Sequence, residues 1–163
     1  RHHARAMTLV HAAVSAELPL HGGGTVALAA CDPGRVLREM EFLSPYLDSE
    51  DFLGGSIDVL FEHEGRVYVL DWKTNLLVGY GASELEADVL AHYELQLRIY
   101  TLAAVRFLGI ETEEEYESRF GGVHYVYLRG LPSGGIFHRR PGYRELDAFR
   151  ADLASRREGL FHG

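Results

Sequence analysis

Two aspartates and a lysine stand among apolar residues in the segment SIDVLFEHEGRVYVLDWKTN. This segment predicts a β-hairpin with a turn at Glu64-Gly65, because glycine supplies the positive φ that a tight hairpin turn needs. In the register that this turn sets, Asp58 lies directly opposite Asp71, with Cβ atoms about 4.5–5.5 Å apart. Lys73 follows Asp71 by two residues and therefore points to the same face of the sheet.

Two facing carboxylates repel each other unless positive charge lies between them. A divalent cation balances both charges, and Mg²⁺ is held in this way by one or two carboxylates together with substrate phosphates. Lys73 would then orient or activate a water molecule, or stabilise charge on a phosphate. The alternative is a surface-facing hairpin with a structural Asp–Lys pair. The residues alone leave both interpretations open, although valines and leucines on both strands favour a hairpin that is covered on both faces.

The chain length predicts a single domain over residues 1–163, whose core we place at residues 36–130. Cys31 is the only cysteine, which excludes a disulfide framework and suits a reducing cytoplasm. No apolar run reaches the ~20 residues of a membrane span, so we expect no membrane partner. The chain begins at Arg1 without an initiator methionine. We therefore expect a fragment that is truncated on its N-terminal side.

The net charge of −8 restricts how the chain could act on nucleic acid. A domain that holds nucleic acid by itself is more often basic. Either nucleic acid is not the partner, or neighbouring domains supply a positive channel. Carboxylates gathered to hold a metal would also add negative charge.

The elements that must position the hairpin follow from periodicity and turn signals. Ser83 is expected to cap a long buried helix, with Glu86 completing a capping box. The order of elements predicts an α/β layer fold with a mixed sheet. We expect a helix over residues 1–20 that stops at Pro19, a loop over 21–26, a strand over 35–43 with regular alternation, a loop over 44–55, the long helix over 84–108, an acidic helix over 111–120, strands over 121–130 and within 133–142, and a C-terminal helix over 143–159.

The hairpin residues also form an ordered motif. Gly55 and Asp58 make the pattern G-x-x-D, and after twelve residues Asp71 and Lys73 make D-x-K. A D-x-K pattern alone has little specificity, whereas the complete ordered set is specific.

Further motifs follow the hairpin along the chain. Gln96 and Tyr100 form the pattern Q-x-x-x-Y and lie one helical turn apart, so both can face the same site. Together with the segments REMEF, FGGVHYVYLRG and GIFHRRP, these motifs resemble the RecB-type PD-(D/E)xK nucleases, in particular the C-terminal nuclease domain of exodeoxyribonuclease V beta subunits. The resemblance covers about residues 38–160.

The resemblance implies a restriction-endonuclease-like fold, a mixed β-sheet flanked by helices. It implies hydrolysis of DNA phosphodiesters with Mg²⁺, for which Mn²⁺ can substitute. Asp58, Asp71 and the backbone carbonyl of Trp72 would hold the metal, and Lys73 would be the catalytic lysine.

Gln96 and Tyr100 would complete the catalytic set. The partners that the resemblance implies are DNA and the other subunits of a RecBCD-type complex, acting in DNA end processing and recombinational repair.

Three residues fit the family pattern less well. The family carries a metal-binding histidine on a helix far upstream, but only 57 residues precede Asp58. His11 is therefore spaced too closely, and we favour a surface or packed histidine. Glu39 fits the family's strand glutamate and is expected to share a strand face with Glu41, although exposed strand glutamates are common.

Two other functions remain open. If the upstream histidine is missing, the chain could be a docking or scaffold module whose nuclease site is incomplete. It could also be a self-standing single-strand nuclease of the same superfamily, which the match at the C-terminal end makes the weaker alternative.

Overall fold

The computed structural model describes residues 2–44 and 53–160. A five-stranded mixed sheet in the order β3-β4-β5-β6-β7 forms its centre, and β1 and β2 form a second, two-stranded sheet. Only β5 and β6 are parallel within the larger sheet. The strands are β1 (Glu17–Pro19), β2 (Thr25–Ala27), β3 (Val36–Ser44), β4 (Leu53–His63), β5 (Arg66–Lys73), β6 (Phe120–Tyr127) and β7 (Ile136–Arg139).

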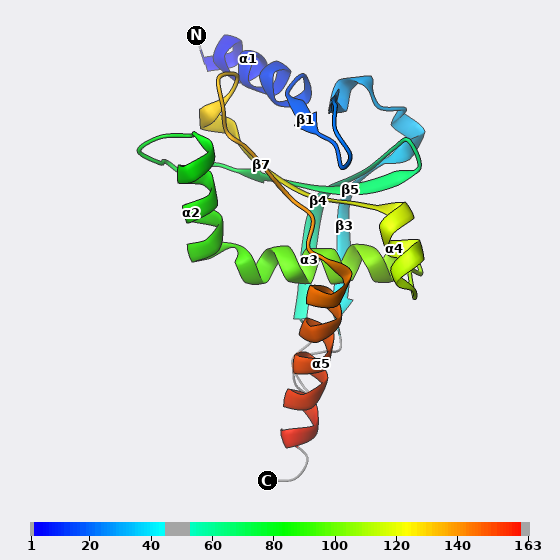
Figure 1. Cartoon of the computed structure of the whole chain (residues 1–163). Coiled ribbons are helices and arrows are strands. Elements are labelled where there is room, and N and C mark those ends of the chain that lie inside the picture. Colours follow the sequence, from blue (N-terminus) through cyan, green and yellow to red (C-terminus); the bar gives the residue numbers. More distant parts are fainter. Residues whose placement is uncertain (1, 45–52, 161–163) are drawn as a thin grey trace.

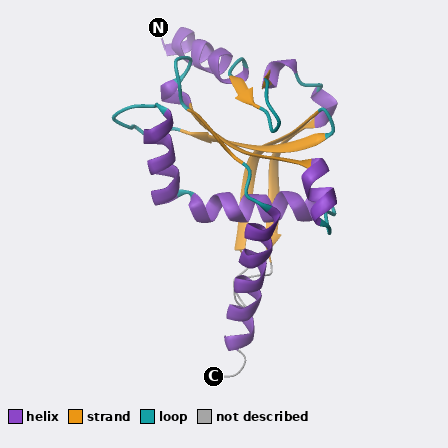
Figure 2. Ribbon diagram, in the orientation of Figure 1, coloured by secondary structure: helices purple, strands orange, loops and turns teal. Residues whose placement is uncertain are grey.

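Helices cover both sides of this sheet (Figure 1, Figure 2). The N-terminal helix α1 lies with β1 and β2 on one side, and α2, α3 and α5 lie on the other, with α5 extending away from the sheet. The helices are α1 (His2–Val14), α2 (Ala82–His92), α3 (Glu94–Phe107), α4 (Glu113–Arg119) and α5 (Tyr143–Leu160), with short 3-10 turns at Leu28–Ala30, Pro33–Arg35 and Leu128–Gly130. The predicted α/β layer fold with a mixed sheet is confirmed.

Two hydrophobic clusters occupy the two faces of the sheet. Leu97 of α3 packs with Val69 in the larger cluster. Leu18 of β1 packs with Tyr68 and Leu70 in the smaller cluster. Successive residues of β5 therefore alternate between the two clusters, so Asp71 lies on the face that α3 covers.

The predicted hairpin is confirmed in turn and register. Glu64 and Gly65 both have positive φ, +50° and +79°, as a two-residue turn of type I′ requires. His63 pairs with Arg66, and the ladder continues inward from there. Glycine fits the second turn position without strain, whereas Glu64 adopts a backbone conformation that side-chain-bearing residues rarely adopt.

The predicted helix over residues 1–20 is too long. It ends at Val14, and Leu18 is almost fully buried in a short strand that pairs with Thr25–Ala27, residues expected in part as a loop. Tertiary packing decides this, because the carbonyl of Pro19 accepts a hydrogen bond of 2.7 Å from His124 Nε2. A helix through this segment would remove both contacts.

The predicted helix over residues 84–108 is two helices. Tyr93 leaves the helical region, with φ −127° and ψ 3°, and separates α2 from α3. No proline or glycine marks the break, so the sequence carries no local signal for it. The predicted Ser83 cap is also wrong, because α2 begins at Ala82, two residues before the predicted start, and its N-cap is Gly81, which has no side chain to cap it.

Four further predicted elements are present with different bounds. The acidic helix is the shorter α4, the strand over 121–130 is β6 and ends at Tyr127 before a 3-10 turn, the edge strand is β7 and the C-terminal helix is α5. Of the predicted loop over 44–55, residues 45–52 lie outside the described part, and Leu53–Gly55 belong to β4. Among the described helices, none is long and apolar enough to cross a membrane.

His124 lies fully buried in β6, on the face that β1 and β2 cover. Its ring stacks on His138 with ring centroids 4.4 Å apart. Burial is the main cause that lowers the pKa of His124 to about 3, and the neighbouring His138 lowers it further. His124 is therefore neutral in the folded protein and keeps its bond to Pro19.

We predict that the free energy of unfolding falls as pH decreases below about 6.5. The unfolded chain protonates His124 near its ordinary pKa of 6.5, whereas the folded chain does not until about pH 3. In this window one proton favours the unfolded state by about 1.4 kcal/mol per pH unit. Urea denaturation between pH 7 and pH 4 measures this slope. His124→Gln should reduce it by about one proton, and the exposed His11→Gln should not. Equal slopes in wild type and His124→Gln would contradict the prediction.

Candidate functional site

A buried ion pair lies at the end of β5. The Lys73 ammonium is 2.7 Å from Asp71 Oδ2, and the two side chains are 7% and 8% exposed. Lys73 is the only lysine among the 16 lysine and arginine residues of the chain. Buried charges persist only when they are paired and hydrogen-bonded, so this pair needs further partners.

Gln96 and Tyr100 of α3 supply those partners. Gln96 Oε1 accepts a hydrogen bond of 2.7 Å from Lys73 Nζ, and Gln96 Nε2 donates one of 3.0 Å to the Tyr100 hydroxyl. The Tyr100 oxygen also lies 2.8 Å from the Ser56 carbonyl oxygen and 3.1 Å from Asp71 Oδ1. One hydroxyl proton serves one of these two acceptors at a time. When Tyr100 donates to Asp71, the predicted residues of β5 and α3 form one closed hydrogen-bonded ring.

The electrostatics of this ring favour a protonated tyrosine. Burial raises the pKa of Tyr100, and the negative charge of Asp71 raises it further. Burial also raises the pKa of Asp71, and the charge of Asp58 adds to this, against the opposing effect of Lys73. Asp71 is therefore a carboxylate whose ionised form depends on nearby positive charge.

Asp58 approaches the same region from β4. The pairing of β4 with β5 runs up to Val59 and Leu70 in the predicted register and ends one position short of Asp58 and Asp71, so the facing of the two aspartates stays a prediction. Asp58 Oδ2 accepts a hydrogen bond of 2.9 Å from the backbone N–H of Trp72. The half-buried Asp58 carboxylate is thus fixed beside the D-x-K segment.

Strands β3 and β4 change their orientation together at this point. Arg38 pairs with Val59 and Met40 pairs with Ile57, which places Glu39 opposite Asp58. Glu39 has a positive φ of +54°, a strained conformation for glutamate.

The packing on either side of this point shows the change. Val36 packs in the smaller cluster, whereas Met40 and Phe42 pack in the larger one. Similarly, Val59 packs in the smaller cluster and Ile57 in the larger. The regular alternation predicted over residues 35–43 is therefore wrong at Glu39, where the strained backbone re-aims the strand.

Gly55 has a steric role in this arrangement. A Cβ atom at Gly55 would lie 2.8 Å from the Phe42 ring, closer than real Cβ contacts. The Phe42 ring in turn packs edge-on against Tyr100, with ring centroids 6.0 Å apart. Glycine at this position of the motif therefore allows Phe42 to support Tyr100.

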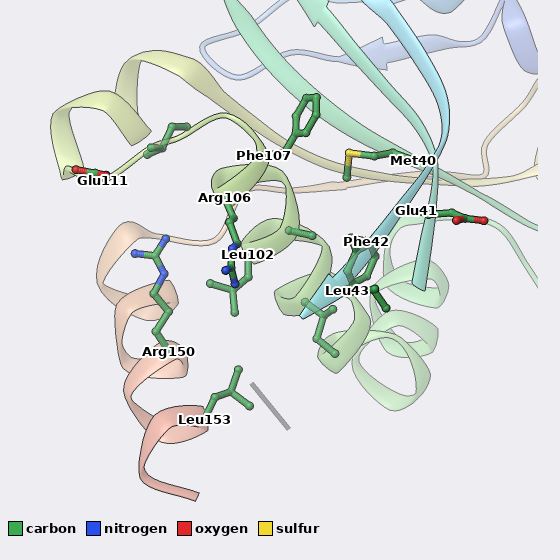
Figure 3. A pocket seen from close by; sticks show the side chains of 13 residues that line it. Met40, Glu41, Phe42, Leu43, Leu102, Arg106, Phe107, Glu111, Arg150 and Leu153 are labelled. Carbon is green, nitrogen blue, oxygen red and sulfur yellow. The ribbon is translucent and has the colours of Figure 1, made fainter. Parts of the chain in front are cut away.

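A groove of about 630 Å³ lies beside the site, between β3, α3 and α5. Its walls are mostly apolar, with Arg106 and Arg150 on the helices and Glu41 on β3 (Figure 3). None of the predicted catalytic or metal-binding residues lines it. Glu41, whose role the sequence left open, thus belongs to this groove.

His11 is not brought to the site. It is exposed on α1, which lies on the side of the sheet away from α3 (Figure 1). Within residues 2–44 and 53–160, no group of three or more His, Cys, Asp or Glu side chains is placed to hold a metal ion. A metal at this site would thus depend on two carboxylates, Asp58 and Asp71, with the Trp72 carbonyl. Such a donor set suits Mg²⁺, which keeps several waters and is bound through one or two carboxylates.

Sequence reasoning missed two aromatic residues at this site. The Lys73 ammonium lies 3.8 Å from the centroid of the Tyr93 ring and 4.6 Å from that of Tyr125. Tyr93 stands three residues before Gln96, so helical spacing could have indicated it. Tyr125 gave no such signal, because β6 meets β5 only in the folded sheet, where it pairs with Asp71.

Comparisons with a family model and with individual known proteins agree with one another. A family model described as "PD-(D/E)XK nuclease superfamily" matches residues 9–163. The chain is 41% identical over 105 residues to "RecBCD enzyme subunit RecB" of Haemophilus influenzae, a match that covers 57% of the chain and 9% of that protein.

Two further relatives carry the same name. The protein from Escherichia coli is 41% identical over 106 residues, covering 59% of the chain and 9% of the relative. That from Borreliella burgdorferi is 28% identical over 152 residues, covering 72% of the chain and 13% of the relative. The chain thus spans about a tenth of the length of these relatives.

We predict that the two aspartates differ in their effect on stability. Asp71→Asn leaves the Lys73 ammonium buried without its counter-charge and should lower the free energy of unfolding by about 3–5 kcal/mol. Asp58→Asn keeps an oxygen for the Trp72 N–H and removes a repelling charge, so it should cost less than about 1 kcal/mol. Urea denaturation in EDTA measures both, with the exposed Asp147→Asn as control. Equal losses of unfolding free energy in Asp58→Asn and Asp71→Asn would contradict the prediction that Asp71 is the counter-charge of the buried Lys73.

Proposed function

Because the chain belongs to the PD-(D/E)XK nuclease superfamily, we propose that it is the metal-dependent DNA nuclease domain of a RecB-like helicase–nuclease subunit. The observation that carries this proposal is the placement of the only lysine. It lies buried between Asp71 and Gln96, at the positions of the D-x-K and Q-x-x-x-Y motifs. A structural ion pair at a protein surface would not need this burial or these partners.

Asp58, Asp71 and the backbone carbonyl of Trp72 would hold Mg²⁺, with Mn²⁺ able to substitute. When bound, the ion supplies positive charge against a phosphate and makes water a stronger nucleophile. Side chains of the protein have the other roles. The Lys73 ammonium, held by Gln96, stabilises negative charge that develops on the phosphate. The Tyr100 hydroxyl holds Asp71 Oδ1 in place.

The proposed partners are DNA and the other subunits of a RecBCD-type complex in bacterial cells. The net charge of −8 is unfavourable for DNA binding by this chain alone. The matched relatives are about ten times longer than their matching segments. Positive surface elsewhere in such a protein or complex would deliver the DNA strand to this site.

A second candidate function is a docking or scaffold module of the same complex. It is favoured by the absence, among the described residues, of any group of three or more metal-ligating side chains. The two candidates differ in metal binding, which the nuclease needs and the scaffold does not.

We predict that the protein degrades end-labelled linear single- or double-stranded DNA in Mg²⁺ or Mn²⁺, and that EDTA stops the reaction. Lys73→Ala should lower the rate by about a hundredfold or more, because it removes a fixed positive group at the reacting phosphate. Asp71→Ala should abolish cutting, since it removes a proposed metal ligand. The control is Arg144→Ala, which removes an exposed positive charge on α5. Cutting that persists in EDTA or in Asp71→Ala would overturn the proposed mechanism.

Metal binding is measured separately from cutting. We expect Mg²⁺ and Mn²⁺ to raise the melting temperature of the wild type, because a ligand that binds only the folded state stabilises it. Asp58→Asn should reduce this effect strongly and Asp147→Asn should not. Calorimetric titration gives the affinities. A wild type that neither binds metal nor cuts DNA would support the scaffold module instead.

A further inference from the structure

The Lys73 ammonium is enclosed by aromatic rings as well as by its polar partners. The rings of Tyr93 and Tyr125 lie 3.8 and 4.6 Å from Nζ. Asp71 and Gln96 accept its hydrogen bonds. A cation over a tyrosine face is attracted by the ring, more strongly when water is excluded, and here the lysine side chain is 7% exposed.

The Tyr93 ring is itself fixed in place. Its residue forms the junction between α2 and α3, where its N–H donates to Val89 and its carbonyl accepts from Leu97, both at 2.8 Å. Its hydroxyl donates a hydrogen bond of 2.9 Å to Asn75 Oδ1. Its ring also packs against that of Tyr125, with centroids 5.6 Å apart.

A polar network holds Asn75 in turn. Asn75 Nδ2 donates to Asp88 Oδ2 at 3.3 Å, and the Tyr127 hydroxyl donates to the same oxygen at 2.8 Å. The Asp88 side chain is 10% exposed. Asn75 follows Lys73 by two residues, so one short segment provides both the lysine and the group that holds the ring over it.

We propose that Tyr93 is a positioning residue that acts on DNA cleavage through Lys73. A lysine side chain has a flexible four-carbon stem, and one ion pair fixes it only weakly. The Tyr93 ring blocks the other rotamers and holds the ammonium between Asp71 and Gln96. This inference rests on the proposed nuclease function for its effect on the cleavage rate. The position of the Lys73 side chain against the Tyr93 ring can be measured without any cutting.

The single lysine makes that measurement direct. Protein labelled with ¹³C-lysine gives one lysine spin system, since Lys73 has no other lysine to overlap with. Ring currents from Tyr93 and Tyr125 should shift the Lys73 Hε signals upfield of their position in the urea-unfolded protein. Single-turnover cleavage of linear DNA in Mg²⁺, measured over a range of protein concentrations, separates the maximal rate from apparent DNA affinity.

Three variants test the role of the ring. Tyr93→Leu should abolish most of the upfield shift and lower the maximal cleavage rate about ten- to thirtyfold, with unchanged DNA affinity. Tyr93→Phe keeps the ring and should restore most of both. The control Phe107→Leu makes the same kind of change at an exposed ring on α3, and should leave both at wild-type values.

If Tyr93→Leu fails to fold, Asn75→Ala replaces it. That variant removes the acceptor of the Tyr93 hydroxyl without removing the ring, so the shift and the rate should fall part of the way together. Unshifted Lys73 Hε signals in the folded wild type would overturn the proposal. So would a Tyr93→Leu protein, or its Asn75→Ala replacement, that loses the shift but cuts at the wild-type rate.

The outcomes also separate this inference from the proposed function. Suppose that the wild type shows the upfield shift but cuts no DNA, and that Tyr93→Leu loses the shift. This result would refute the nuclease proposal and support the packing of the Tyr93 ring on Lys73. A wild type that cuts DNA with an unshifted lysine would do the reverse.

Discussion

The arrangement of the site depends on one buried contact, the ion pair of Lys73 with Asp71. Removing two charges from water is costly, and mutual attraction alone often fails to compensate for it. The structure surrounds this pair with Gln96, Tyr100 and the aromatic face of Tyr93. Helix α3 lies against the end of β5, and the break before it lies at Tyr93, whose ring contacts Lys73. Replacing a buried ion pair by an apolar pair of similar volume often leaves a protein as stable or more stable, so stability alone does not account for Asp71 and Lys73.

The hairpin was predictable because local rules determine it completely. A glycine turn and the period of two set which residues face one another, so the pairing of the strands from His63 and Arg66 to Val59 and Leu70 follows from counting alone. The motif Q-x-x-x-Y indicated Gln96 and Tyr100, and the structure brings both to Lys73. The family and its mixed sheet also followed from ordered motifs in the sequence.

Other features depend on contacts between distant segments, which no local pattern encodes. The break at Tyr93 has no proline or glycine to announce it and accompanies the contacts of its ring with Lys73 and Asn75. The strand that contains Leu18 forms because the Leu18 side chain is buried against the far face of the sheet. The strained φ of Glu39 is visible only once β3 and β4 are paired.

The residue between the two charged positions of β5 gives the opposite face of the sheet a part in this site. Trp72 alternates with Asp71 and Lys73, and its ring packs into the smaller cluster, together with Leu18 and Val26 of the β1-β2 unit. Strand β5 thus has one face in the site and the other in the smaller cluster. Looser packing in the smaller cluster would let β5 shift, and the Asp71 carboxylate and the Lys73 ammonium would move with it. The positions of Asp71 and Lys73 therefore depend partly on residues of the smaller cluster, on the opposite face of the sheet.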